Sequence, residues 1–179
     1  ISGCTKKFDE INTTKNALAN LQDSQIPFLF STAEANATNS GWNYQVAQNL
    51  FHDQYAQYFA NTTTYFPSDR LVIRMDWIGA LWGPLYTQVV PQLQTIFEKT
   101  DPSSPQYALA NIVWVQAFQR NTDTWGPIPY FNAGVVATGV PYDAQDVIYD
   151  DFFKRLASAV AVLKSNTGES PFGSYDLIY

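Results

Sequence analysis

The stretch 143-DAQDVIYDDFFKRLASAVAVLKS-165 carries the clearest helical pattern of the chain. Its apolar side chains recur every three or four residues, at Ile148, Phe152, Leu156, Ala159 and Leu163. That spacing places them on one face of an α-helix, which has 3.6 residues per turn. Acidic residues cluster early in the stretch and basic residues late, as the helix dipole favours, and Asp143 has the position of an N-cap. We therefore expect a helix over 144–165.

Four further helices are predicted upstream, three from the same periodicity and the last because apolar residues occupy nearly every face of it, which suggests a helix buried on most sides. They cover residues 26–38, 43–60, 73–98 and 106–120. Pro84 and Pro91 lie inside the third, and because proline removes a backbone hydrogen bond we expect a kink or break there. Residues 61–70 lack a helical period and predict a loop, and two prolines and a glycine predict a tight corner at 125–130. The predicted fold class is all-α, with helix–loop–helix pairs, long irregular loops and no substantial strand.

Length and composition exclude several classes of protein. A chain of 179 residues fits one domain or part of a larger one. Aromatic residues make up 16% of it, which excludes a disordered tail, since disordered segments are poor in aromatics. Lys and Arg number 10 against 16 Asp and Glu, so the net charge is −6 and a nucleic acid partner is not expected. No apolar run approaches the roughly 18 residues of a membrane-spanning helix.

The start of the chain holds its only cysteine. Ile1-Ser2-Gly3-Cys4 is similar to a bacterial lipobox, in which an aliphatic residue and two small residues precede a cysteine that is lipidated after cleavage. On this interpretation residues 1–15 are a lipobox remnant and extended tether, and residues 16–179 are the helical domain. A lipid on Cys4 would then be the only attachment to a membrane. The alternative is that Cys4 is an incidental thiol.

Candidate catalytic groups do not form a recognisable set. Asp150 and Asp151 could suggest the carboxylate pair of a glycoside hydrolase, but adjacent side chains on a helix point about 100° apart. His52 has no serine-nucleophile motif to serve. One histidine and one cysteine are also too few for a His- or Cys-rich metal site. The sequence therefore predicts no catalytic residue, no metal and no cofactor, and a glycoside hydrolase is the weakest hypothesis considered.

Aromatic side chains near loops are the remaining candidates for function. Trp42, Tyr65 and Phe66 lie at or near predicted loops, with Asn61 and Asp69 as polar neighbours. Flat aromatic faces stack on the C–H faces of sugar rings, while Asn and Asp can bond the hydroxyls. These five residues are therefore the predicted ligand-binding site. The alternative is that the rings fold back onto the helices.

Other residues on the predicted helices are interpreted as structural. Gly79 and Gly83 are expected to permit close helix packing, and Trp77 and Trp82 could belong to the core or to its edge. The rings expected in the core are Trp114, Phe118, Phe152 and Phe153.

Three segments together resemble one protein family. They are 8-FDEIN-12 after the lipobox-like cysteine, 122-TDTWGPIPY-130 at the predicted corner, and 142-YDAQDVIY-149 at the start of the 144–165 helix. Each is moderately specific alone. In this order and at this spacing they are typical of the SusD/RagB outer-membrane nutrient-binding lipoproteins of Bacteroidetes. The resemblance covers essentially the whole chain, which looks like an N-terminal portion of the longer family members.

The resemblance implies a fold, a location and a function. It implies tetratricopeptide-like helix pairs, one of them formed by the helices at 106–120 and 144–165. It also implies a lipid-anchored protein at the cell surface of the outer membrane, which binds nutrient oligosaccharides and delivers them to a SusC-like TonB-dependent transporter. Some relatives take peptides or other nutrients, and ligand-contacting rings vary in position, so no binding residues transfer. The competing hypothesis is a helical-repeat scaffold or adaptor that binds peptides or proteins and uses its rings only as core.

Overall fold

A computed structural model describes residues 22–135, 138–166, 168 and 170–178. Cys4, the tether at 1–15 and the 8–12 segment lie outside the described residues, so what was predicted for them stays a prediction. Within the described part the chain is helical, and the one β-bridge found there joins Ile128 to Asp143. The all-α fold class is therefore confirmed.

The described residues form α-helices, π-helical segments and short 3₁₀ turns. The α-helices are α2 (Ile26–Ala37), α3 (Gly41–Tyr44), α4 (Asp53–Tyr55), α5 (Met75–Pro84), α6 (Val90–Lys99), α7 (Pro105–Trp125) and α8 (Gln145–Ser165). The π-helical segments η2 (Gln45–His52) and η4 (Leu85–Val89) join α3 to α4 and α5 to α6. The 3₁₀ turns are η1 (Asp23–Gln25), η3 (Ser68–Arg70) and η5 (Gly173–Tyr175).

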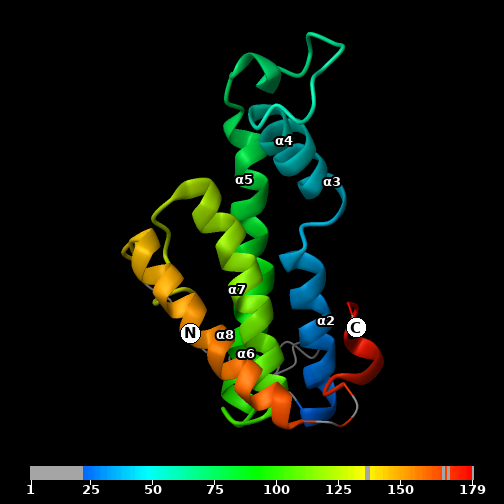
Figure 1. The fold of residues 1–179 in the computed structure, drawn as a ribbon, viewed down its shortest axis with the longest axis vertical. Helices are drawn as coiled ribbons and strands as arrows, with labels where there is room; N and C mark the ends of the chain where they lie inside the picture. Colours follow the sequence, from blue (N-terminus) through cyan, green and yellow to red (C-terminus); the bar gives the residue numbers. More distant parts are fainter. Residues whose placement is uncertain (1–21, 136–137, 167, 169, 179) are drawn as a thin grey trace, which may run out of the picture.

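The helices pack in two regions along one central column (Figure 1). The column consists of α5, η4 and α6, which run end to end. Around its α6 half pack α2, α7 and α8, and we call this region the bundle, together with the corner at 126–143 and the segment 170–178. Against its α5 half packs η2, and we call α3 to α5, with the connection 56–74, the arm. α7 and α8 lie side by side and form the expected helix pair.

The central column is interrupted where its prolines predict. α5 ends at Pro84, and Leu85–Val89 are π-helical before the α-helix resumes. Val90, where α6 begins, still donates its N–H to the Leu85 carbonyl, and Pro91 next to it has no N–H with which to continue that ladder. The break expected within 73–98 is therefore confirmed, in the form of a π-helical segment.

The helix expected over 43–60 has different ends in the structure. It begins at Gly41 and stops at Tyr55. Gln57 has a φ of 63°, a left-handed conformation that cannot continue a right-handed helix. Tyr58 and Phe59 beyond it are exposed. The apolar spacing in the sequence thus continues to Tyr58 although the helix ends at Tyr55, and no glycine or proline marks that end.

The bundle contains the main hydrophobic core. Each of its elements contributes a fully buried side chain, the largest being Phe30 of α2, Leu93 of α6, Phe118 of α7, Tyr130 of the corner and Ile148 of α8. Their rings and branched chains interlock, with Phe118 and Tyr130 edge to face at 4.9 Å. The bundle therefore derives its stability from burial of large apolar surface.

The rings predicted for the core divide in the structure. Trp114, Phe118 and Phe152 are buried, as predicted. Phe153 is 67% exposed, so its assignment to the core is wrong. It lies about 100° around α8 from Phe152, and only one of two adjacent positions on a helix can face the core.

Residues 170–178 run back along α2. The rings of Phe172 and Phe30 stack with centroids 3.9 Å apart. The Leu177 N–H donates to Glu34 Oε2 at 2.8 Å, and burial raises the pKa of Glu34. The Ser31 hydroxyl donates to the Tyr175 carbonyl, across 144 positions of sequence. This segment therefore closes the bundle over its first described helix.

The corner at 126–143 turns the chain from α7 into α8. Gly126 ends α7 with a φ of 73°, which a residue with a side chain would adopt only with strain. Asp143 Oδ2 accepts hydrogen bonds from the N–H groups of Tyr130 and Phe131, both at 2.9 Å. The N-cap of α8 is Ala144, without a side-chain cap. The prediction of Asp143 as the N-cap is therefore wrong, because its carboxylate closes the corner instead.

Candidate functional site

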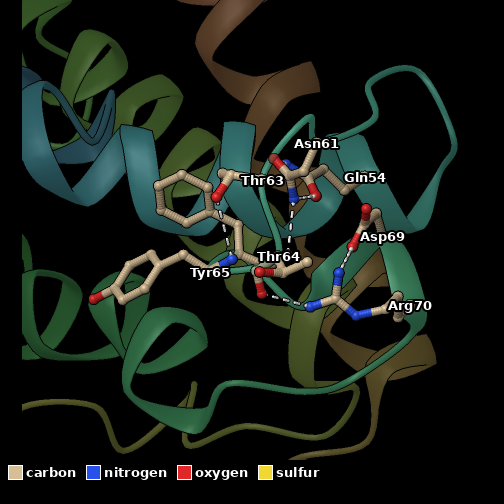
Figure 2. Close-up of polar contacts among 8 residues, drawn as sticks. Gln54, Asn61, Thr63, Thr64, Tyr65, Asp69 and Arg70 are labelled. Atoms are coloured by element: carbon tan, nitrogen blue, oxygen red, sulfur yellow. Dashed lines mark hydrogen bonds and ion pairs between the residues drawn. The ribbon is translucent and has the colours of Figure 1, made fainter.

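Asn61 holds the predicted ligand loop, residues 61–70, onto the end of α4 (Figure 2). Its Oδ1 accepts a hydrogen bond from Gln54 Nε2 at 2.9 Å. Its Nδ2 donates to Gln54 Oε1 and, at 3.1 Å, to the Phe66 carbonyl. Both ends of the amide are thus bonded within the protein, so the role the geometry gives Asn61 is to shape the loop.

Arg70 braces the other end of this loop. Its guanidinium donates to the Thr64 carbonyl at 2.9 Å and pairs with Asp69 at 3.3 Å. Because Arg70 and Asp69 are partly exposed, we assign this pair a weak contribution to stability. The ion pair compensates the charge of Asp69, which lies on the opposite side of the loop from the Tyr65 ring.

The two rings of the loop lie in different surroundings. Tyr65 is 72% exposed, and in Figure 2 its ring points away from the contacts of Asn61 and Arg70. Phe66 is half-buried, with its ring 5.1 Å from that of Tyr65 and 6.0 Å from that of Trp77. Phe66 therefore anchors the loop on the arm, and Tyr65 is the ring that the loop presents.

Trp42 is not brought together with the other four predicted residues. It lies in α3 and is 61% exposed. The loop follows the opposite end of the α3–η2–α4 helix, roughly 20 Å along its axis, and Figure 1 shows the connection 56–74 beyond the α4 end. The structure thus brings Asn61, Tyr65, Phe66 and Asp69 together and leaves Trp42 apart.

A polar cleft of about 310 Å³ separates the arm from the end of α7. His52 of η2 contacts Thr124 across it, with Nε2 and Oγ1 3.1 Å apart. Arg120 donates to the Thr38 carbonyl at 3.2 Å, and its guanidinium lies over the Tyr44 ring. Burial lowers the pKa of His52, so the imidazole is neutral at neutral pH. These contacts join residues 72 and 82 positions apart, which no local sequence pattern could reveal.

A second, larger hollow lies between α5 and the corner. We call it the aromatic hollow. Its volume is about 440 Å³, and it is lined by Gly79, Trp82, Gly83, Trp125, Pro127 and Tyr142. The Trp82 and Tyr142 rings are within 28° of parallel, with centroids 6.1 Å apart, and Trp125 meets Trp82 edge to face at 5.6 Å. A Cβ added to Gly79 or Gly83 would meet nothing within 4 Å, so the expected close packing there is wrong.

Asp151 belongs to a hydrogen-bond network inside the bundle. Its Oδ2 accepts from the Tyr130 hydroxyl and from Arg155 Nε, each at 2.6 Å, and Arg155 also donates to Asn111 at 2.6 Å. Burial and the bond to Asp151 raise the pKa of Tyr130. Asp150 is exposed on the outer face of α8. The two neighbouring aspartates therefore do not form a pair across a substrate site.

The described residues contain neither a candidate membrane-spanning helix nor a cluster of metal-ligating side chains. None of the helices described is both long and apolar enough to cross a bilayer. In the same part of the chain, no three His, Cys, Asp or Glu side chains gather where they could hold a metal ion.

Comparison with known proteins identifies the family. Residues 5–179 match the SusD-like family, described as SusD and RagB outer membrane lipoproteins. The chain belongs to the SusD-like family. No match was found among curated proteins.

Solved structures of SusD homologues are similar to this fold. A chitin-binding SusD homologue from Flavobacterium johnsoniae is 28% identical, with a TM-score of 0.68 over 79% of this chain and 30% of its own. A homologue from Bacteroides vulgatus is 26% identical, with a TM-score of 0.65 over 83% of this chain and 34% of its own. One from Bacteroides thetaiotaomicron, at 23% identity and a TM-score of 0.63, covers 86% of this chain and 32% of its own. The chain thus spans about a third of the length of these relatives.

The residues that carried the family resemblance build the corner. The Thr122 hydroxyl donates to the Gly126 carbonyl at 2.6 Å, and Gln145 donates to the Thr122 carbonyl at 2.8 Å. The Tyr149 hydroxyl donates to Asp123 at 2.6 Å. Thr122, Asp123, Gln145 and Tyr149 of these segments therefore have a structural role in holding the corner.

Proposed function

We propose that this chain is part of a cell-surface lipoprotein that binds nutrient oligosaccharides and delivers them to a SusC-like TonB-dependent transporter. Membership of a family of outer-membrane lipoproteins supports the location, and a lipid on Cys4 would supply the anchor. The similarity to a chitin-binding homologue supports a glycan ligand. The function is binding and transfer, without catalysis.

The single observation that carries the oligosaccharide proposal is the presentation of Tyr65. Its ring is 72% exposed, and the loop that carries it bonds its own polar groups internally, so the ring is held outward and free to contact a ligand. A sugar ring offers an apolar C–H face to stack on the aromatic ring and hydroxyls for polar neighbours.

The surface next to the loop supports a protein partner. Leu71, Val72, Ile73 and Met75 are all exposed where the chain enters α5. A run of exposed apolar side chains is typical of a protein contact. We therefore assign this stretch to docking on the transporter, which co-purification of the transporter with wild-type protein but not with Val72→Asp would test.

Calorimetric titration of the full-length protein tests the ligand class. Tyr65→Ala should weaken oligosaccharide binding by about 1–3 kcal/mol, the usual effect of removing an aromatic contact. Phe153→Ala is the matched control, because that ring is equally exposed but lies on α8, away from the loop. Equal affinity of Tyr65→Ala and wild type would clear the loop of a role in binding.

The same titration separates the oligosaccharide hypothesis from the adaptor hypothesis. Cellotetraose, maltotetraose and chitotetraose are titrated beside extended peptides of similar length. Tight binding of peptides with no binding of the sugars would favour the adaptor. For the anchor, Cys4→Ala should release the protein from the outer-membrane fraction, and a mutant that stays membrane-bound would contradict lipidation of Cys4.

A further inference from the structure

Two glycines in the interior of α5 have no packing reason among the described residues. Gly79 and Gly83 are four residues apart and so share one face of the helix. A Cβ on either would meet nothing within 4 Å. Glycine is also a poorer helix former than alanine, so neither local preference nor crowding explains the pair. What they provide is open space against bare helix backbone.

Aromatic rings surround that space. Trp82 and Tyr142 lie within 28° of parallel, and Trp125 stands edge to face against Trp82. Tyr142 is 62% exposed although it stands in a hollow of about 440 Å³. That volume is within the range of small-molecule sites, which are concave and mainly apolar.

We propose that the aromatic hollow binds one neutral pyranose ring of an oligosaccharide through its C–H face. The proposal rests on the oligosaccharide-binding function and gives that function a second contact point. None of the lining residues is charged, which favours a neutral sugar over an acidic one.

The hollow and the Tyr65 loop can be tested separately. Trp77, which the loop's Phe66 contacts, and Trp82, which lines the hollow, lie about 140° apart around α5. A substitution in one place therefore leaves the other intact. Extended oligosaccharides could use both, each through a different sugar unit.

Calorimetric titration of the full-length protein with cellotetraose, maltotetraose and chitotetraose tests the proposal. Tyr142→Ala should weaken binding of the preferred sugar about tenfold or more, because its ring contributes stacking surface. Tyr58→Ala is the control. The Tyr58 ring is exposed, like that of Tyr142, but it lies on the arm and is not part of the hollow. Ligand should also shift the tryptophan fluorescence of wild type, because Trp82 and Trp125 become covered.

Substitution of Gly79 adds a readout that does not depend on the ligand. Gly79→Ala should raise Tm by about 2–4 °C, because alanine is the better helix former and the space before it is empty. Gly79→Leu should fold normally and abolish sugar binding by filling the hollow. A fall in Tm with either variant would show that protein fills the hollow in the full-length chain, and would overturn the proposal.

The outcomes also distinguish this proposal from the function on which it rests. Sugar binding that survives Tyr142→Ala and Gly79→Leu but is lost with Tyr65→Ala overturns the hollow alone. Absence of binding of any of the three tetrasaccharides to wild type overturns both. Loss of binding in the hollow variants with wild-type Tm supports both.

Discussion

The bundle and the arm contain similar kinds of residue and use them differently. In the described structure the bundle core joins 21 buried residues from α2, η4, α6, α7, α8, the corner and the returning segment. The arm core joins five, from η2 and α5. The bundle buries a set of rings that contact one another, namely Phe30, Trp114, Phe118, Tyr130, Phe152 and Phe172, whereas Trp42, Tyr58, Phe59 and Tyr65 of the arm face solvent.

This difference shows where the aromatic content of the chain acts. Buried rings stabilise the bundle, and the exposed rings of the arm contribute little to folding. A bundle with a large core can hold a thin arm in place without help from the arm's own packing. Buried rings therefore stabilise mainly the bundle, whereas recognition uses exposed rings on the arm and at the corner, and substitutions can test that separation of stability from recognition.

The largest expected effect comes from the bundle core. Phe118→Ala should lower the free energy of unfolding by about 3–5 kcal/mol, because it leaves a cavity among fully buried neighbours. Phe66→Ala in the arm should cost only about 1–2 kcal/mol, since the ring is half-buried and can be replaced by water. Urea unfolding at equilibrium measures both. Equal losses would mean that arm and bundle share one core.

The next effect concerns the corner. Asp143→Ala should lower stability by about 2–3 kcal/mol, because two backbone N–H groups lose a charged acceptor. Asp146→Ala is the control, as its exposed carboxylate accepts only from the adjacent Val147 N–H, and its loss should cost less than about 1 kcal/mol. Thermal unfolding compares them. A loss for Asp143→Ala no larger than that for Asp146→Ala would show that the Asp143 carboxylate does not hold the corner.

Acidification should act oppositely on the two regions. Burial lowers the pKa of His52, so the unfolded chain binds the proton first, and the arm loses stability as pH falls below 6.5. Burial raises the pKa of Glu34, so the folded bundle binds its proton first, and this contribution is lost as pH rises above 4.5. Hydrogen exchange of η2 and α2 amides between pH 4 and 7 measures each slope, with His52→Gln and Glu34→Gln as the respective controls. Slopes of the same sign in both regions would contradict the assignment.

The smallest expected effect is on stability at the exposed rings. Tyr65→Ala and Phe153→Ala should each leave the free energy of unfolding within about 0.5 kcal/mol of wild type, because neither ring is buried. A clear loss of stability from Tyr65→Ala, measured by urea unfolding, would place that ring in the arm's packing and weaken the separation of stability from recognition.

Sequence periodicity predicted the bundle better than the arm. The helices α2 and α8 follow the 3.6-residue pattern because each buries one face on a large core, whereas α7 is buried on most sides. The end of the arm helix at Tyr55 depends on the left-handed Gln57, which no residue type marks. The position of Asp143 in the sequence is typical of an N-cap, but its carboxylate accepts a hydrogen bond from the N–H of Tyr130, 13 positions away.

The candidate sites also depend on contacts between residues that are distant in sequence, which local patterns do not predict. The residues 61–70 lie close in sequence, so their grouping in a loop could be predicted, whereas the exposure of Tyr65 and the anchoring of Phe66 depend on Trp77. The aromatic hollow brings Trp82 of α5 to Trp125 at the end of α7 and to Tyr142 of the corner, both more than 40 positions away. Only the packing of α5 against the corner creates that neighbourhood.

The return of residues 170–178 to α2 has a kinetic consequence. Contacts such as that of Leu177 with Glu34 span 143 positions, so nearly the whole described chain has to be available before they form. Closing such long loops slows folding, and the face of α2 that residues 170–178 cover stays open to water until then. We expect a late refolding phase in which the α2 amides become protected, which pulsed hydrogen exchange would detect. Phe172→Ala should slow or remove that phase.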